Sequence, residues 1–168
     1  MSKKIVQIAL MVAVSSVFFS IENYIPTPLP WMRLGLANII TLLALKWWGI
    51  KVAVIIVILR VFLGSLLPGK LFTPVFLLSF TGGMTAAFAM FIIIRFLDRV
   101  FSLTGVSIIG AFIKNITQIV VVYLMYVRHL NILSILPIFL LSSLISGIII
   151  GIIADVIHKK LSKYIKLS

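Results

Sequence analysis

The 168-residue chain has no cysteine and only three carboxylates, Glu22, Asp98 and Asp155. Without cysteine there are no disulfides, thiolate metal ligands or redox-active thiols. The aspartates do not form the D-D-x-x-D spacing that holds magnesium in diphosphate-using enzymes, and no Walker lysine loop is present. The two histidines, His129 and His158, are expected at opposite membrane faces, where they cannot share a metal. We therefore expect no enzyme activity, no metal and no cofactor.

Charge of either sign is scarce relative to apolar character. Charged residues make up 11% of the chain, hydrophobic residues make up 62%, and the mean hydropathy is +1.30. Soluble proteins carry about 25% charged residues, so the apolar surface of this chain requires lipid as its solvent. The net charge of +12 does not indicate a nucleic-acid partner, because the cations separate apolar stretches and do not gather on one basic face.

The apolar residues fall into six stretches joined by short polar segments. A transmembrane helix needs about 20 apolar residues, within a range of about 17–25. We predict one all-α integral membrane domain over residues 1–168, built from six transmembrane helices. Their expected ranges are about 5–21, 34–48, 51–67, 73–94, 105–127 and 132–154. The second stretch is short for a span, so it must borrow Trp31 and Met32 or be partly broken.

The distribution of lysine and arginine predicts the orientation. With the N-terminus inside, ten cations lie in segments on the cytoplasmic side and three lie outside, namely Arg33, Lys70 and Arg128. Segments rich in lysine and arginine stay in the cytoplasm. We therefore predict that both termini are cytoplasmic. The remaining two cations, Arg60 and Lys114, lie inside apolar stretches.

Arg60 and Lys114 are the strongest candidates for a binding site. A cation near the bilayer centre costs at least about 2.5–3.5 kcal/mol on insertion scales and usually marks a functional site. Both predicted helices run outward, and Arg60 lies roughly 13 Å from the inner end of its helix, with Lys114 at a similar depth. We interpret the pair as a site for an anionic ligand. Three alternatives remain open: the cations snorkel, pair with Glu22, or bond to backbone carbonyls.

Three amide side chains accompany the two cations. Asn38 lies early in the second helix. On the fifth helix, Lys114 and Gln118 share one face, and Asn115 lies beside it. These amides are candidates for orienting hydrogen bonds to a solute, although buried amides also commonly join neighbouring helices.

Small residues recur at helical spacing in three stretches, and such spacing lets helix backbones approach closely. On the fourth and sixth helices we interpret them as packing faces. Ala9 and Ala13 repeat the pattern on the first helix. The residues on the fourth and sixth helices are Ser79, Gly82, Gly83, Ala86, Ala87, Ser143, Gly147 and Gly151.

Four segments carry a resemblance to a known family: 33–40 (RLGLANII), 60–65 (RVFLGS), 79–83 (SFTGG) and 105–118 (GVSIIGAFIKNITQ). They resemble the Gx transporter family, often labelled "heptaprenyl diphosphate synthase component I", over nearly the whole chain. That family is grouped with the substrate-binding S-components of energy-coupling factor (ECF) vitamin transporters. The resemblance implies a six-helix S-component-like bundle with cytoplasmic termini in the bacterial cytoplasmic membrane.

The resemblance also implies partners and roles. In S-components an alanine-x-x-x-alanine motif on helix 1 contacts the coupling subunit, and Ala9 and Ala13 match this motif. The substrate lies in the outer half, under the loops that correspond here to 22–33 and 68–72. The specific signatures of riboflavin, thiamine and biotin binders are absent. Lys114 stands where relatives often have histidine.

Two hypotheses of different class follow. The first is a substrate-binding membrane component for a small anionic or amphipathic solute, such as a vitamin, flavin or isoprenoid/quinone precursor, energised by an ECF coupling subunit and ATPases on other chains. The second is a non-catalytic membrane subunit or scaffold associated with prenylquinone synthesis or flavin-based extracellular electron transfer. A true prenyltransferase is disfavoured by the missing aspartate motif. The candidate substrate-binding residues are Arg60, Lys114, Asn38, Asn115 and Gln118.

Overall fold

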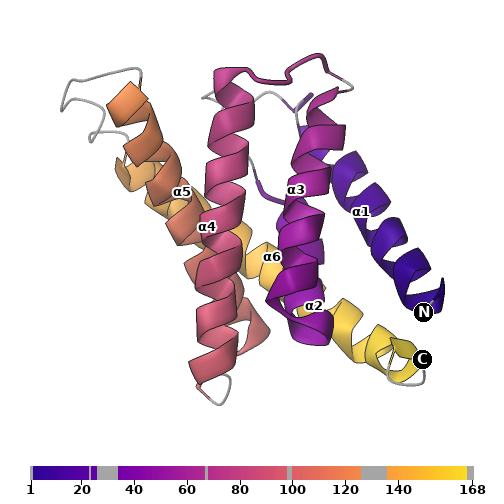
Figure 1. Ribbon diagram of the computed structural model, residues 1–168. Coiled ribbons are helices and arrows are strands. Elements are labelled where there is room, and N and C mark those ends of the chain that lie inside the picture. Colours follow the sequence, from indigo (N-terminus) through magenta and orange to yellow (C-terminus); the bar gives the residue numbers. More distant parts are fainter. Residues whose placement is uncertain are drawn as a thin grey trace.

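The computed structural model describes residues 2–22, 24–25, 34–66, 68–97, 100–125 and 136–165. In these residues the backbone forms six helices and no strand (Figure 1), which confirms the predicted all-helical fold. The orientation of the bundle in the membrane stays a prediction. The helices are α1 (Ser2–Glu22), α2 (Ala37–Trp48), α3 (Ile50–Leu66), α4 (Pro74–Leu97), α5 (Leu103–Met125) and α6 (Leu136–Ile165).

Helix lengths depart from the prediction at two places. Among the described residues, α1, α4, α5 and α6 are long and apolar enough to cross a membrane. The α2 helix has only 12 residues, or about 18 Å at 1.5 Å per residue, so the second apolar stretch is not one full span. The α6 helix continues to Ile165, well beyond the expected end at residue 154. An apolar stretch ends at the first charges, but helical backbone does not have to end there.

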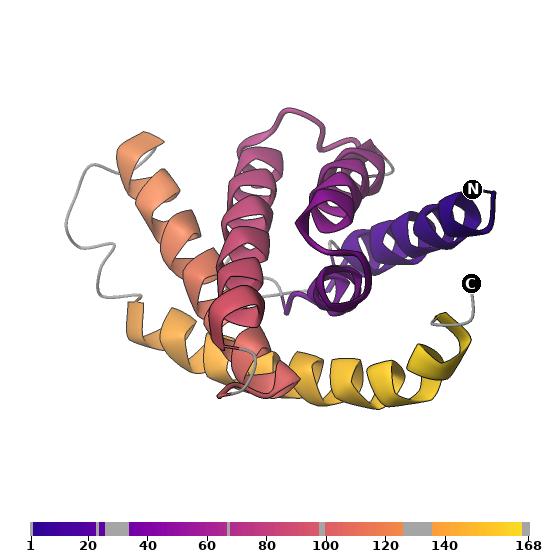
Figure 2. The same cartoon turned by 60° about the horizontal axis from the view of Figure 1, so that its bottom comes forward.

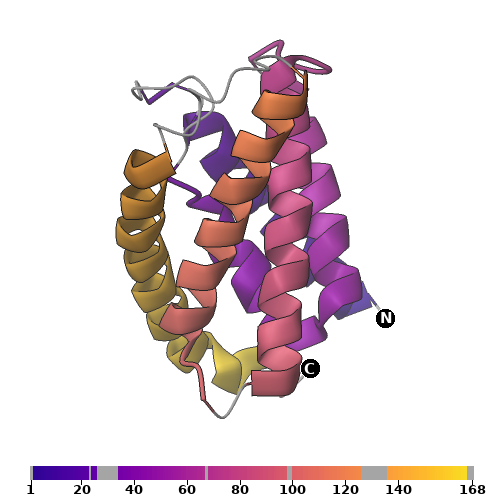
Figure 3. The ribbon, with the colours of Figure 1, turned by 90° about the vertical axis from the view of Figure 1, so that its left-hand side faces the viewer.

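The α4, α5 and α6 helices pack through glycine, and α6 lies beside α5 (Figure 3); the two helices cross at an angle in the view of Figure 2. A methyl group on Gly147 of α6 would come within 2.6 Å of the Ile108 Cα on α5, and one on Gly151 would overlap the Thr104 Cα. The same close approach occurs between α4 and α5, where Gly110 lies against the Met90 side chain. Gly147 and Gly151 therefore set backbone-to-backbone contacts, as their spacing predicts, and Gly110 makes room for the Met90 side chain.

The α2 helix occupies the interior despite its short length. It packs against α1, α3, α4 and α6, and its Leu42 and Ala44 are fully buried. The neighbouring α1 and α3 helices meet where Phe19 packs on Gly64, and the Ser20 hydroxyl donates a hydrogen bond of 3.3 Å to the Gly64 carbonyl oxygen. Residues 34–36, just before α2, are not helical, and Gly35 among them is buried. The chain therefore enters the bundle before α2 begins.

The outer surface of the bundle is apolar, as expected of a multi-pass membrane protein. Large hydrophobic side chains are exposed along α1, α4 and α6. The charged residues Asp155 and Lys159 form an i, i+4 ion pair near the end of α6, at 2.6 Å. This pair is solvent-exposed, so it contributes little to stability.

Candidate functional site

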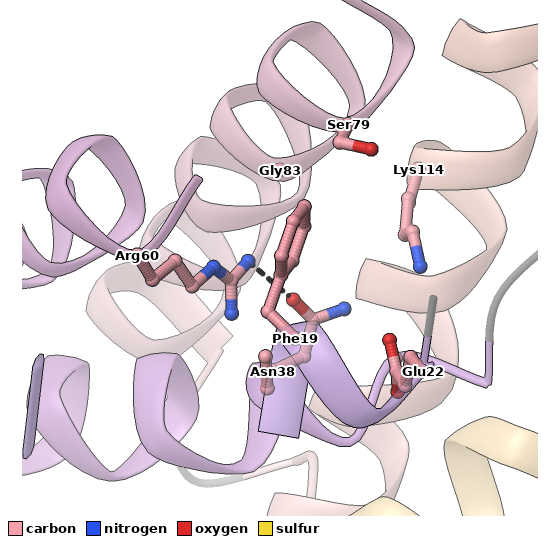
Figure 4. A pocket seen from close by; sticks show the side chains of 9 residues that line it. Phe19, Glu22, Asn38, Arg60, Ser79, Gly83 and Lys114 are labelled. Atoms are coloured by element: carbon pink, nitrogen blue, oxygen red, sulfur yellow. Dashed lines mark hydrogen bonds between the residues drawn. The ribbon is translucent and has the colours of Figure 1, made fainter. Parts of the chain in front are cut away.

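A small polar cavity lies inside the bundle where α1 to α5 meet (Figure 4). It brings together three of the predicted site residues, Asn38, Arg60 and Lys114. The space inside is about 20 Å³, which is room for about one water molecule. The lining residues are Phe19, Glu22, Gly35, Ala37, Asn38, Arg60, Ser79, Gly83 and Lys114.

Arg60 reaches the cavity from α3 and is only 3% exposed. Its Nη1 donates a 3.0 Å hydrogen bond to the Thr41 hydroxyl oxygen, and its Nη2 donates a 2.8 Å bond to the Asn38 Oδ1. Both acceptors lie on α2, so the guanidinium is held in one orientation against that helix. Neither acceptor carries a charge, so these two bonds orient the cation without neutralising it.

Lys114 enters from the opposite side, on α5, and is also buried. Its ammonium reaches the chain just before α2, because a methyl group on Gly35 would lie 3.3 Å from the Lys114 Nζ and 3.2 Å from the Asn38 Nδ2. Gly35 has a φ of +85°, a conformation that side chains other than glycine rarely adopt. Lys114 therefore lies beside Asn38 and lines the same cavity as Arg60, while the role of the two cations in binding a ligand stays a prediction.

Glu22 lies in the same cavity, as the alternative in which the cations pair with Glu22 requires. It is buried, and its Oε1 accepts a hydrogen bond from the backbone N–H of Leu36. Figure 4 shows the Glu22 carboxylate and the Lys114 ammonium on the same side of the cavity. The described lining thus holds two cations and one carboxylate, which leaves one formal positive charge in excess.

The start of α2 adds positive potential to this cavity. Ala37 and Asn38, in the first turn of α2, line the cavity. The side chain of the N-cap residue Leu36 makes no capping bond, and the Glu22 carboxylate accepts the Leu36 N–H at this helix end. A helix N-terminus carries a partial positive charge of about half an elementary unit. Short helices whose N-termini point at an anion site also occur in membrane transporters. The short length of α2 was the available sequence signal for this arrangement.

Two adjacent glycines on α4 separate the cation-bearing helices. A methyl group on Gly82 would lie 3.2 Å from the Cγ atoms of both Lys114 and Gln118 on α5. A methyl group on Gly83 would lie 3.4 Å from the Arg60 Nη2 on α3. Consecutive residues of one helix therefore let α3 and α5 approach from two sides.

Asn115 and Gln118 lie outside the cavity lining. The Asn115 amide donates hydrogen bonds to the Phe139 carbonyl oxygen, at 3.1 Å, and the Ser143 hydroxyl, at 2.7 Å, both on α6. The Gln118 amide donates a 3.3 Å bond to the Leu78 carbonyl oxygen on α4. These contacts favour the alternative in which the amides join helices, and their role in substrate binding stays a prediction.

Ala9 and Ala13 lie on the exposed face of α1. Ala9 borders an open apolar groove of about 330 Å³ between α1 and α3, which Ile8 and Leu59 also line. Both alanines are accessible to a partner, and their contact with one stays a prediction. The expected loop 22–33 lies largely outside the described residues.

Comparison with known proteins identifies the family of this chain. The sequence profile described as heptaprenyl diphosphate synthase component I matches residues 11–157. The chain belongs to this family. A solved structure of the S component of a bacterial ECF transporter has a similar fold, with a TM-score of 0.76, 20% sequence identity and 98% of each chain covered. At that identity the likeness shows the shared fold. No curated protein matches the chain significantly.

Proposed function

We propose that this member of the heptaprenyl diphosphate synthase component I family is the solute-binding membrane component of an ECF-type uptake system. One observation carries the proposal. Arg60, Lys114 and Asn38 come from three different helices and converge on one buried cavity with an excess positive charge, inside a fold shared with an S component. Structural cations inside a bilayer protein do not need to share a cavity.

The solute carries an anionic group that lies between the Arg60 guanidinium and the Lys114 ammonium. Asn38 orients this group through its amide nitrogen, while its amide oxygen keeps the Arg60 guanidinium in place. Charge–charge attraction is several-fold stronger in such a buried site than in water. A vitamin, a flavin or an isoprenoid/quinone precursor with an acidic group meets these requirements.

Binding requires the cavity to widen. Sites for small molecules usually occupy about 300–1,000 Å³, whereas the space here is about 20 Å³. We interpret the described conformation as the solute-free form. Because Arg60 is bonded to Asn38 and Thr41 of α2, and Glu22 is bonded to Leu36 just before it, a shift of the start of α2 is the simplest way to open the site.

Energy for uptake comes from other chains, because the sequence contains no nucleotide-binding loop. We place the coupling subunit on the exposed face of α1 that carries Ala9 and Ala13, and we place the complex in the bacterial cytoplasmic membrane. The chain itself performs no chemical step in this scheme. Among the described residues, no cluster of three potential metal ligands occurs.

A second function is suggested by the family description, which names a component of a prenyl diphosphate synthase. In that case the chain is a non-catalytic membrane subunit, and Arg60 contacts a lipid headgroup or a prenyl diphosphate made by a partner. Co-purification from native membranes separates the two functions. ECF ATPases bound to the chain support uptake, whereas a prenyl diphosphate synthase or a flavin-dependent dehydrogenase supports the second function.

The solute site is tested by native mass spectrometry and thermal shift of the purified protein, with and without exposure to cell lysate. We expect wild type to retain a small anionic molecule and Arg60→Ala and Lys114→Ala to lose it. Arg95→Ala is the matched control, because it removes one cation from the exposed end of α4. No retained molecule in wild type, together with full stability of both cavity variants, would contradict the proposal.

A further inference from the structure

An apolar groove separate from the solute cavity lies between α1 and α6. The α2 helix forms its floor, and the groove has a volume of about 300 Å³. Its lining is almost entirely hydrophobic and shares no residue with the solute cavity. Representative lining residues are Leu10 and Val14 on α1, Ile40 and Leu43 on α2, and Ile153 and Leu161 on α6.

The groove has the same extent on all three helices. It runs over 10–18 of α1, 39–47 of α2 and 153–161 of α6, and eight residues of helix correspond to about 12 Å. One leaflet of the hydrocarbon core is about 15 Å thick, half of the roughly 30 Å core. A groove of this length fits an acyl chain in one leaflet. The transmembrane helix of a partner would need a groove that crosses both leaflets.

The end of the groove at residue 47 is fixed by a ring contact. The indole N–H of Trp47 donates a 2.9 Å hydrogen bond to the His158 Nδ1, and the two rings stack with centroids 6.0 Å apart. This contact links α2 to α6 and holds the Trp47 wall in place. Tryptophan is enriched at the membrane interface, so this end of the groove is the one that meets the lipid headgroups.

Basic residues gather at the same end. Lys46 precedes Trp47, and Lys160 precedes Leu161 at the end of the groove. Lys3 and Lys4 begin α1, and the start of α1 lies at the same end of the bundle as the end of α6 (Figures 1 and 3). The carboxylate described in this region, Asp155, already pairs with Lys159.

We propose that this groove binds one acyl chain of an anionic phospholipid, with its headgroup held by Lys46 and Lys160. The apolar lining fits the chain, and the basic end fits a negatively charged headgroup. The site lies on the flank of α1 away from the groove that Ala9 borders.

 A coupling subunit that contacts Ala9 beside the α1–α3 groove and a lipid in the α1–α6 groove therefore do not compete for the same surface.

The experiment compares lipids on the intact chain. The protein is purified in mild detergent with equal amounts of phosphatidylglycerol and phosphatidylcholine of matched chain length, and native mass spectrometry counts the bound lipids. Wild type is expected to prefer phosphatidylglycerol. Lys46→Gln and Lys160→Gln should each lower this preference about fivefold, the size expected for one cation near an anionic headgroup. Lys70→Gln, in the segment between α3 and α4 at the other end of the bundle, is the matched control and should leave it unchanged (Figure 1).

A second pair of variants tests the groove itself. Val14→Trp fills it and should reduce retention of both lipids, whereas Val17→Trp, on the exposed face of α1, should not. A photo-reactive side chain at Leu10 should crosslink to lipid in native membranes. Equal binding of the two lipids by wild type, an equal loss in Lys70→Gln, or crosslinking of Leu10 to a protein chain would each overturn the proposal. The charge variants keep the test decisive if Val14→Trp fails to fold.

Discussion

The two halves of the bundle are packed in different ways. The α5 and α6 helices meet backbone to backbone through Gly147 and Gly151, and the Met90 side chain of α4 packs on Gly110 of α5. The α1, α2 and α3 helices surround a short central helix and leave open apolar grooves on both flanks of α1. The first arrangement favours a fixed framework, and the second leaves room for partners and for movement.

The solute cavity lies at the boundary between these halves. Lys114 comes from the closely packed half, whereas Glu22, Asn38 and Arg60 come from the half with the grooves. A shift of the start of α2, as proposed for solute entry, would move Asn38 relative to Lys114 and would change its bond to Arg60 and the bond between Glu22 and Leu36.

Separating α5 from α6 is expected to have the largest effect on stability, because it disrupts the closely packed half of the bundle. Gly147→Leu places a side chain against the Ile108 backbone, where even one methyl group would come within 2.6 Å. Overpacking of this kind costs about 1–3 kcal/mol or more, and a backbone contact gives little room to relax. We expect the largest fall in melting temperature of any variant considered, measured in detergent. Ile148→Phe adds volume on the exposed face one residue away and should leave the melting temperature nearly unchanged.

Glu22→Gln tests the charge balance of the cavity where the two halves of the bundle meet. Glutamine keeps an oxygen that can accept the Leu36 N–H bond but removes the one carboxylate among the described lining residues. We expect the empty protein to become less stable, because two buried cations lose a counter-charge. We also expect roughly tenfold tighter retention of an anionic solute. Thermal melting with and without lysate measures both effects, and weaker retention would show that Glu22 helps to bind the solute directly.

Asn115→Ala is expected to have the smallest effect. It removes the two hydrogen bonds from α5 to Phe139 and Ser143 of α6, and interhelical bonds in membranes average about 0.6 kcal/mol each. The melting temperature should therefore fall slightly, while solute retention stays unchanged. Thr117→Ala is the matched control, because its hydroxyl bonds only to the Ile113 carbonyl within α5. Loss of solute retention in Asn115→Ala would return Asn115 to the binding site.

Much of the fold follows from the sequence because apolar length and charge spacing act locally. The six stretches predict the six helices, and the small residues of α6 predict its packing on α5. The α6 helix ends at Ile165, eleven residues beyond the end expected at residue 154, although most of the charged and polar residues of α6 follow that point. The backbone hydrogen bonds of a helix form with polar as well as apolar side chains, so the first charged residue does not end the helix.

The site was predictable only in part. Arg60 and Lys114 stand out because a buried cation is costly wherever it lies. Glu22 was expected only as an alternative partner of these cations, and Thr41 was not singled out, since its hydroxyl meets Arg60 only through the packing of α2 on α3. For Asn115 and Gln118, helical spacing puts them near Lys114, but small rotations about the α5 axis decide whether a side chain faces the cavity or a neighbouring helix.

The adjacent glycines of α4 have a consequence for which solutes the family can accept. Gly82 faces α5 and Gly83 faces α3, so the two cation-bearing helices approach α4 at neighbouring positions. A methyl group at Gly82 would lie 3.2 Å from the Lys114 Cγ, and one at Gly83 would lie 3.2 Å from the Val57 Cγ1 and 3.4 Å from the Arg60 Nη2. Alanine at either position would therefore press on one of these helices and leave the other in place. Relatives with alanine at either position should therefore hold anionic groups of a different span.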